Sequence, residues 1–215
     1  MFKELVKAYK IVGYGLAIKR QMMFAVGFAI IGIVLDIFTG GTQPTGGFYI
    51  VLSGMFIYQL IISSDVSTLI QASPYKKKIQ CTYPILATAP WMYLTFTIVA
   101  ISHFFKIRGG DEELRHTQSA VILMIGCFLF ICLIFFGIVY KYFILSMIIM
   151  CLTVTFPMFV INRFIERDLF ANYGLCVAIV YVLLTLGCVI SCLLARLTYK
   201  KDISPIAFKQ AMNKS

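Results

Sequence analysis

The chain has 215 residues, of which 60% are hydrophobic and only 13% are charged, and its mean hydropathy is +0.91. A soluble globular domain of this size carries about twice that share of charged residues. The composition therefore excludes a secreted domain, a soluble enzyme and a disordered chain, and it indicates a polytopic membrane protein.

Residues 1–20 predict an amphipathic helix. Apolar side chains recur at steps of three and four residues, and lysines occupy another face. The apolar positions are Phe2, Leu5, Val6, Tyr9, Val12 and Leu16, and the lysines are Lys3, Lys7 and Lys10. This pattern is typical of a helix that lies in the inner membrane interface with its lysines directed at anionic headgroups. The alternative is a solvated cap that only follows the positive-inside rule.

Six apolar windows follow this segment. A helix that crosses the hydrocarbon core needs roughly 20 apolar residues. The windows cover 22–39, 48–63, 81–103, 119–140, 142–162 and 173–195, and none shows the alternation of a strand, so we expect an all-α fold and no barrel. Of all the Asp, Glu, Lys and Arg residues, only Asp36 lies within a window. It is close to an outer end, where we expect it to reach water.

The distribution of cations predicts the orientation, because Lys and Arg are retained on the cytoplasmic side. With the N-terminus inside, the inner segments hold 14 of the 19 cations, and acidic residues balance the outer five. Both termini of this multi-pass cell-membrane protein are therefore predicted to be cytoplasmic. The inner cations are scattered among four segments, so we expect no nucleic-acid partner. They are Lys3, Lys7, Lys10, Lys19, Arg20, Lys76, Lys77, Lys78, Lys141, Arg196, Lys200, Lys201, Lys209 and Lys214.

The inner segment 64–80, between the second and third windows, predicts a short helix. Ser73 followed by Pro74 is a helix-start signal, because the serine oxygen can accept a backbone N–H and proline suits the first helical position. The helix would span about 74–80 and carry three adjacent lysines, Lys76 to Lys78. Such a helix is placed to touch a cytoplasmic partner. A plain basic turn is the alternative.

The residues that membrane catalysis requires are scarce. Both histidines, His103 and His116, lie near the outer side, and all seven cysteines fall within apolar windows, where a thiol packs as a small hydrophobe. Gly41 and Gly46 have the glycine spacing of a phosphate loop, but the Lys and Ser or Thr that must follow are missing. Glu112, Glu113 and Arg115 suggest the pattern of a membrane metalloprotease, but they belong to a polar outer link, 105–118, and the distant later histidine of that pattern is missing. We therefore expect no catalytic, cofactor-binding or metal-binding residues, and no enzyme.

Three features together resemble the permease subunit of a type 2 ABC transporter of the exporter type. They are the interfacial N-terminal helix, the six spans with both ends inside, and the short basic helix that begins with Pro between spans two and three. In that family the inner segment contacts the ATPase as a coupling helix. The residues in that place here are Ser73, Pro74, Tyr75, Lys76, Lys77 and Lys78.

The resemblance implies a half-transporter with three parts: an interfacial helix over 1–20, a transmembrane domain over 21–196 and a cytoplasmic tail over 197–215. Its implied partners are a cytoplasmic ATP-binding cassette subunit, which hydrolyses the ATP, and a second permease copy or a paralogue, in a homo- or heterodimer surrounded by membrane lipid. The apolar lining suits an amphipathic peptide, a lipid or an apolar drug.

A non-transporting protein is the alternative function. An immunity or assembly factor would bind a peptide or a membrane partner through the same apolar surfaces. Small residues at helical spacing, Ala25 with Ala29 and Gly187 with Ser191, predict close helix packing under either function.

Overall fold

The computed structural model describes residues 2–13, 18–65, 74–148, 151, 172–202 and 204–206. Every regular element in these ranges is a helix. The helices are α1 (Phe2–Val12), α2 (Ile18–Phe38), α3 (Thr45–Asp65), α5 (Lys76–Cys81), α6 (Tyr83–Ile107), α7 (Glu112–Ile138) and α9 (Tyr173–Leu197), and residues 143–148 are also helical.

Four stretches of the described chain are long and apolar enough to cross a membrane, which confirms an all-α protein of membrane character. They are Ile18–Phe38, Lys76–Ile107, Glu112–Ile138 and Tyr173–Leu197, and α3 adds a shorter apolar stretch, Thr45–Leu60. Five of the six predicted windows coincide with α2, α3, α6, α7 and α9. The window 142–162 lies mostly outside the described residues.

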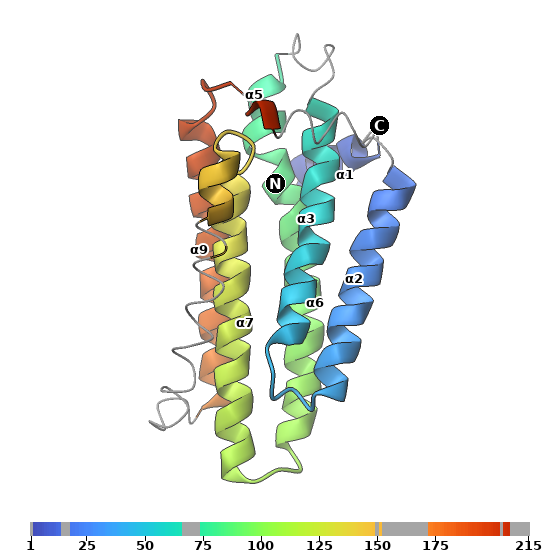
Figure 1. Ribbon diagram of the computed structural model, residues 1–215, viewed down its shortest axis with the longest axis vertical. Helices are drawn as coiled ribbons and strands as arrows, with labels where there is room; N and C mark the ends of the chain where they lie inside the picture. The colour runs from blue at the N-terminus through green and yellow to red at the C-terminus, as the bar shows by residue number, and fades with distance from the viewer. Residues whose placement is uncertain are drawn as a thin grey trace.

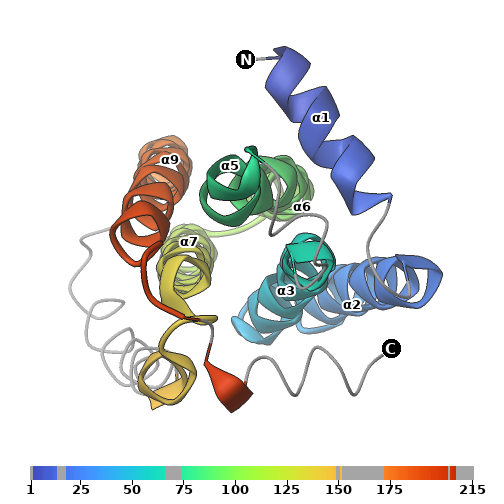
Figure 2. The same ribbon diagram turned by 90° about the horizontal axis from the view of Figure 1, so that it is seen from above.

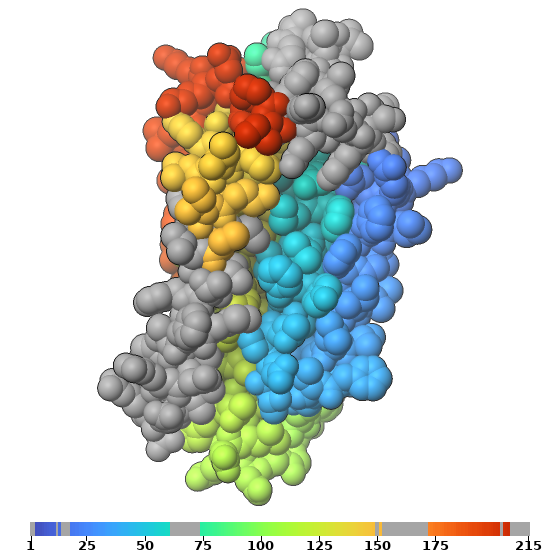
Figure 3. Space-filling model, in the orientation of Figure 1, coloured from blue at the N-terminus to red at the C-terminus, as the bar shows by residue number. Residues whose placement is uncertain are grey.

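The long helices form one bundle with α3, α6 and α7 at its centre (Figures 1 and 2). α2 flanks α3, and α9 flanks α7, which is the most buried of the candidate spans. α1 lies across one end of the bundle instead of along it (Figure 2). α2 and α3 together form a continuous wall on one face (Figure 3). Large side chains, among them Met92, Phe96, Phe128, Leu129 and Phe136, fill the interior between the helices.

Small residues allow the flanking helices to approach the centre closely, as their spacing predicts. Ala25 and Ala29 are buried on the face of α2 that packs against α3, and Gly187 and Ser191 are buried on α9. A Cβ atom on Gly32 of α2 would lie 2.7 Å from the carbonyl oxygen of Gly46. At Gly32 the backbones of α2 and α3 touch, and a larger residue has no room.

Most of the described charged residues belong to a few segments of the sequence, and Figure 1 shows these segments at the two ends of the bundle. One end, which we call the predicted inner end, carries α1, the start of α2, α5, the turn at 139–142 and residues 198–206. The predicted outer end carries the α2–α3 and α6–α7 links. The described parts of both chain ends therefore lie at the same end of the bundle.

The polar link at 105–118 is much shorter than predicted. α6 continues to Ile107 and α7 begins at Glu112, so only residues 108–111 connect them. Asp111 adopts an extended conformation before α7, with φ −71° and ψ 170°. Glu112 and Glu113 then form the first helical turn, where the helix dipole favours acidic side chains.

Candidate functional site

The predicted coupling segment lies at the predicted inner end. Ser73 falls outside the described residues, Pro74 and Tyr75 form a turn, and Lys76 to Lys78 are the first half of α5. The helix begins two residues later than expected, because the carbonyl oxygen of Tyr75 accepts the first helical hydrogen bonds, from the backbone N–H groups of Lys78 at 2.9 Å and Ile79 at 3.0 Å. Tyr75 is therefore the N-cap residue, with 54% of its surface exposed.

α5 continues almost without interruption into α6. The N–H of Thr82 donates to the carbonyl of Lys78 at 2.9 Å, and the N–H of Leu86 donates to the carbonyl of Thr82 at 3.0 Å. Pro84 lies in the first turn of α6, where its missing donor costs little. Pro90 is the proline inside this helix. The two helices form one nearly continuous rod from the inner end to the outer end.

α1 packs against this rod through a small residue. Ala8 is fully buried in a cluster with Leu60, Ile79, Tyr83 and Ala87. Because Ala8 has a small side chain, the backbone of α1 can lie directly on the bundle. The three lysines of α1 remain exposed. The predicted amphipathic stripe did not include Ala8, which lies beside it.

Glu4 is the polar centre of this contact. Its carboxylate accepts a hydrogen bond from the Tyr83 hydroxyl at 2.8 Å and forms ion pairs with Lys7 at 3.4 Å and Lys78 at 3.9 Å. The Tyr83 hydrogen bond is the main reason that the pKa of Glu4 lies below its ordinary value, and Lys7 and Lys78 act in the same direction. Glu4 thus joins α1, α5 and α6. The sequence signal for this role was that Glu4 is the one acidic residue among the lysines of residues 1–20.

The C-terminal residues complete the inner surface. The N–H of Ser204 donates to the carbonyl of Tyr140 at 2.9 Å, and the Lys201 ammonium lies 4.6 Å from the centre of the Tyr142 ring. The Lys77 ammonium lies 5.9 Å from the ring centre of Tyr199. We call the surface formed by α1, α5, the 139–142 turn and residues 198–206 the inner platform. It is basic and is assembled from four separate segments.

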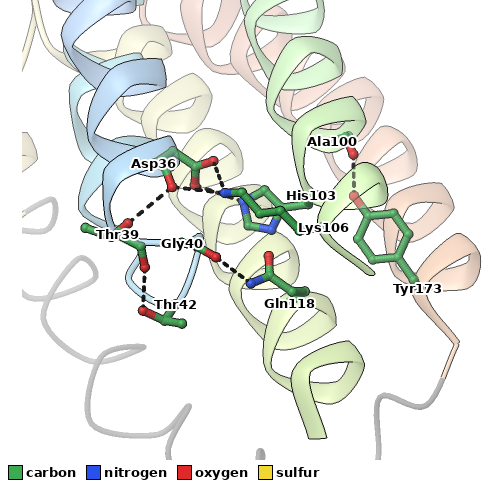
Figure 4. A network of polar contacts seen from close by, with 9 residues as sticks. All are labelled: Asp36, Thr39, Gly40, Thr42, Ala100, His103, Lys106, Gln118 and Tyr173. Atoms are coloured by element: carbon green, nitrogen blue, oxygen red, sulfur yellow. Dashed lines mark hydrogen bonds and ion pairs between the residues drawn. The ribbon is translucent and has the colours of Figure 1, made fainter. Parts of the chain in front are cut away.

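A second polar group lies at the predicted outer end (Figure 4). The Asp36 carboxylate is 2.8 Å from Nε2 of His103 and 3.4 Å from Nζ of Lys106, which also donates to the Asp36 carbonyl at 3.0 Å. Asp36 is 1% exposed and His103 is fully buried. The expectation that Asp36 reaches water is wrong, because α6 covers it and supplies the His103 imidazole and the Lys106 ammonium in place of solvent.

The link after α2 closes this group, which we call the Asp36 cluster. The Gln118 amide of α7 donates to the carbonyl of Gly40 at 2.8 Å. Gly40 and Gly41 have positive φ values of 64° and 71°, and a Cβ on Gly41 would lie 2.6 Å from Oε1 of Gln118. Only glycine fits a left-handed position this crowded. The cluster thereby fastens the α2–α3 hairpin to both α6 and α7.

Two sequence signals for this cluster were overlooked. Asp36 continues the buried stripe of α2 that contains Ala25, Ala29 and Gly32, so it faces the bundle. His103 and Lys106 are three residues apart and therefore share one face of α6. Among the described residues, no group of three or more His, Cys, Asp or Glu side chains could hold a metal ion.

No family model, no curated protein and no solved structure matches this chain. What the chain can do is therefore inferred from the geometry at the two ends of the helix bundle. The Asp36 cluster is best explained as a structural element that stabilises the packing of α2 against α6 and α7, because its charges compensate one another. The inner platform presents exposed lysines, which suit contact with an acidic surface of another macromolecule.

Proposed function

We propose that this chain is the membrane-spanning subunit of an ABC transporter, which moves an amphipathic or apolar substrate using ATP hydrolysed by a separate cytoplasmic subunit. The observation that carries the proposal is the continuity of α5 with α6 at the inner platform. A subunit that pressed on Tyr75 and the lysines of α5 would move α6 as a rod.

Polar contacts at both ends of the α5–α6 rod support the same mechanism. At the inner end, Glu4 connects α1 to Lys78 of α5 and Tyr83 of α6. At the other end, His103 and Lys106 of α6 hold Asp36 of α2. A displacement of α5 would therefore be transmitted to the opposite end of the bundle and to the α2–α3 hairpin. Rigid-body shifts of this kind open and close paths between subunits.

A separate subunit would hydrolyse the ATP. The chain's own glycine-rich link at 40–47 lacks the Lys and Ser or Thr of a phosphate loop. The two permease copies, or a permease and a paralogue, would form the path between them. The substrate would contact mainly aliphatic and aromatic side chains, which suits a peptide, a lipid or a drug of amphipathic or apolar character.

Co-purification tests the proposal. The full chain, solubilised in mild detergent, should bring down a soluble ATPase that contains a complete phosphate loop, and the complex should hydrolyse ATP. Recovery of the chain with a membrane partner or a peptide, and without an ATPase, would instead favour the immunity or assembly factor.

Substitution of the coupling segment tests the role of its residues. The variant with both Pro74→Ala and Tyr75→Ala should insert normally and keep ATPase binding, but ATP hydrolysis should no longer drive transport in reconstituted vesicles. Glu113→Ala is the control, because Glu113 is exposed at the opposite end of the bundle and lies outside the inner platform. Unchanged coupling in the double variant would contradict the assignment of these residues.

A further inference from the structure

A groove lies between α6 and α9 at the predicted outer end. Hydrogen bonds of long side chains bridge the two helices: Tyr93 to Thr185 and Thr97 to Tyr181, both at 2.8 Å, and the Tyr173 hydroxyl to the carbonyl of Ala100 at 2.6 Å. The last of these is visible in Figure 4. An open cavity of about 940 Å³ lies beside the last two of these bridges, whose residues are part of its lining.

The lining of this groove divides into two chemical zones. Ile101 and Phe104 of α6 and Val177 of α9 form apolar walls. Arg108, just after α6, and Arg115, in the first turns of α7, add two guanidinium groups. The described lining contains no carboxylate, although Asp111, Glu112 and Glu113 are neighbours in the sequence. The groove is therefore cationic next to an apolar surface.

The position of the arginines matches the depth of lipid headgroups. Arg108 follows the last residue of a candidate membrane-spanning helix, and its guanidinium lies 4.9 Å from the ring centre of Phe104. Phe104 and Ile101 are themselves exposed on the side of the bundle. An arginine whose stem follows an apolar wall and whose head reaches the interface is placed to pair with a phosphate. Guanidinium groups bind phosphate oxygens in a bidentate manner, and two are available here.

We propose that this groove binds an anionic phospholipid, with the phosphate at Arg108 and Arg115 and the acyl chains along Phe104 and Val177. Charge selects the ligand, because the two cations have no carboxylate beside them in the described lining. The proposal does not depend on the transport function, since a structural lipid would occupy the same place in a protein that transports nothing.

Photo-crosslinking in vesicles of phosphatidylcholine tests the proposal. Two probes with the same diazirine-bearing acyl chains are compared, one a phosphatidylglycerol and the other a phosphatidylcholine, and labelled residues are mapped by mass spectrometry. We expect the anionic probe to label the groove residues Phe104 and Val177 roughly 25-fold more than the zwitterionic probe, since each of the two cations near an anionic headgroup contributes about a factor of five. Exposed residues of α2, such as Ile30 and Val34, should be labelled equally by both probes.

Variants separate a specific site from general attraction. Arg108→Gln with Arg115→Gln should abolish the preference at the groove and leave the labelling of α2 unchanged. Gly174→Leu should reduce labelling by both probes, because Gly174 lines the groove and a leucine side chain there would fill part of it. The fold should tolerate this change, since a Cβ at Gly174 meets only Asn172, at 3.5 Å. The control, Arg196→Gln with Lys200→Gln, removes two cations at the opposite end and should preserve the preference. Equal labelling by both probes, or a preference that survives the double arginine variant, would overturn the proposal.

Discussion

At the scale of single residues, Asp36 shows how an acidic side chain is held inside the bundle. An ionised carboxylate in a bilayer is costly unless it is paired and hydrogen-bonded. Here the imidazole of His103 and the ammonium of Lys106 contact its two oxygens. Lys106 is 22% exposed, so solvent still reaches the cationic partner. The pairing makes Asp36 the residue on which the attachment of α2 to α6 depends.

Removal of this carboxylate should destabilise the protein. Asp36→Ala leaves His103 and Lys106 without their partner, and breaking a buried pair from one side costs about 3 kcal/mol. Ile37→Ala is the matched control, because Ile37 is the next residue of α2 and its side chain is largely exposed. Denaturant unfolding in mixed micelles measures both free energies. A loss no larger for Asp36→Ala than for Ile37→Ala would show that the pair does not stabilise the fold.

Glu4 predicts a dependence of α1 docking on pH. Its pKa is lower in the folded state than in the unfolded state, mainly through the Tyr83 hydrogen bond, so its contribution is complete above its ordinary pKa of 4.5 and is lost as the pH falls below it. A spin label at Lys10→Cys in a cysteine-free variant should become more mobile in that acidic range. When the Glu4→Gln substitution is added to this variant, the mobility of the spin label should not change over the same pH range. A wild-type response that persists in Glu4→Gln would assign the effect to another group.

At the scale of elements, the contact between α2 and α3 depends on the absence of a side chain at Gly32. Gly32→Ala should destabilise the protein by about 1–3 kcal/mol, because the added Cβ would meet the backbone carbonyl of Gly46, which cannot rotate away. Gly27→Ala in the same helix is the control: a Cβ there has nothing within 4 Å, and alanine improves helix propensity by up to about 1 kcal/mol. Thermal unfolding of the two variants should therefore shift in opposite directions. Equal shifts would contradict the close packing of these backbones.

The helices were predictable from the sequence because length and apolarity determine them. The first and last residues of the helices were less predictable, because a polar residue does not by itself end a helix. Lys106 and Glu112 are helical although the sequence assigned them to a link. The Asp36 cluster could not be derived from any one segment, because its members come from α2, α6 and α7 and their contact depends on how the helices pack. Glu4 was missed for the same reason, since its partners Lys78 and Tyr83 are distant in sequence.

At the scale of the whole molecule, the separation of charge between the two ends predicts the orientation in the membrane. In a cysteine-free variant, a single cysteine at Lys10 or Lys200 should resist a membrane-impermeant maleimide in intact cells, and one at Glu112 should react. All three positions are exposed, so burial does not confound the comparison. All three should react after the cells are opened. Reaction at Lys10 or Lys200 in intact cells would reverse the predicted orientation.

The parallel pairing of α7 with α9 has a consequence for biogenesis. Both helices run from the predicted outer end to the predicted inner end, and they pack closely where Gly126 meets Val180 and Gly137 meets Ser191. Neighbours in a hairpin can associate as soon as the second helix emerges, but these two are separated by residues 139–172. A nascent chain that has not yet reached Tyr173 therefore exposes the α9-facing side of α7 to lipid. That side is where membrane quality control would recognise an unfinished chain.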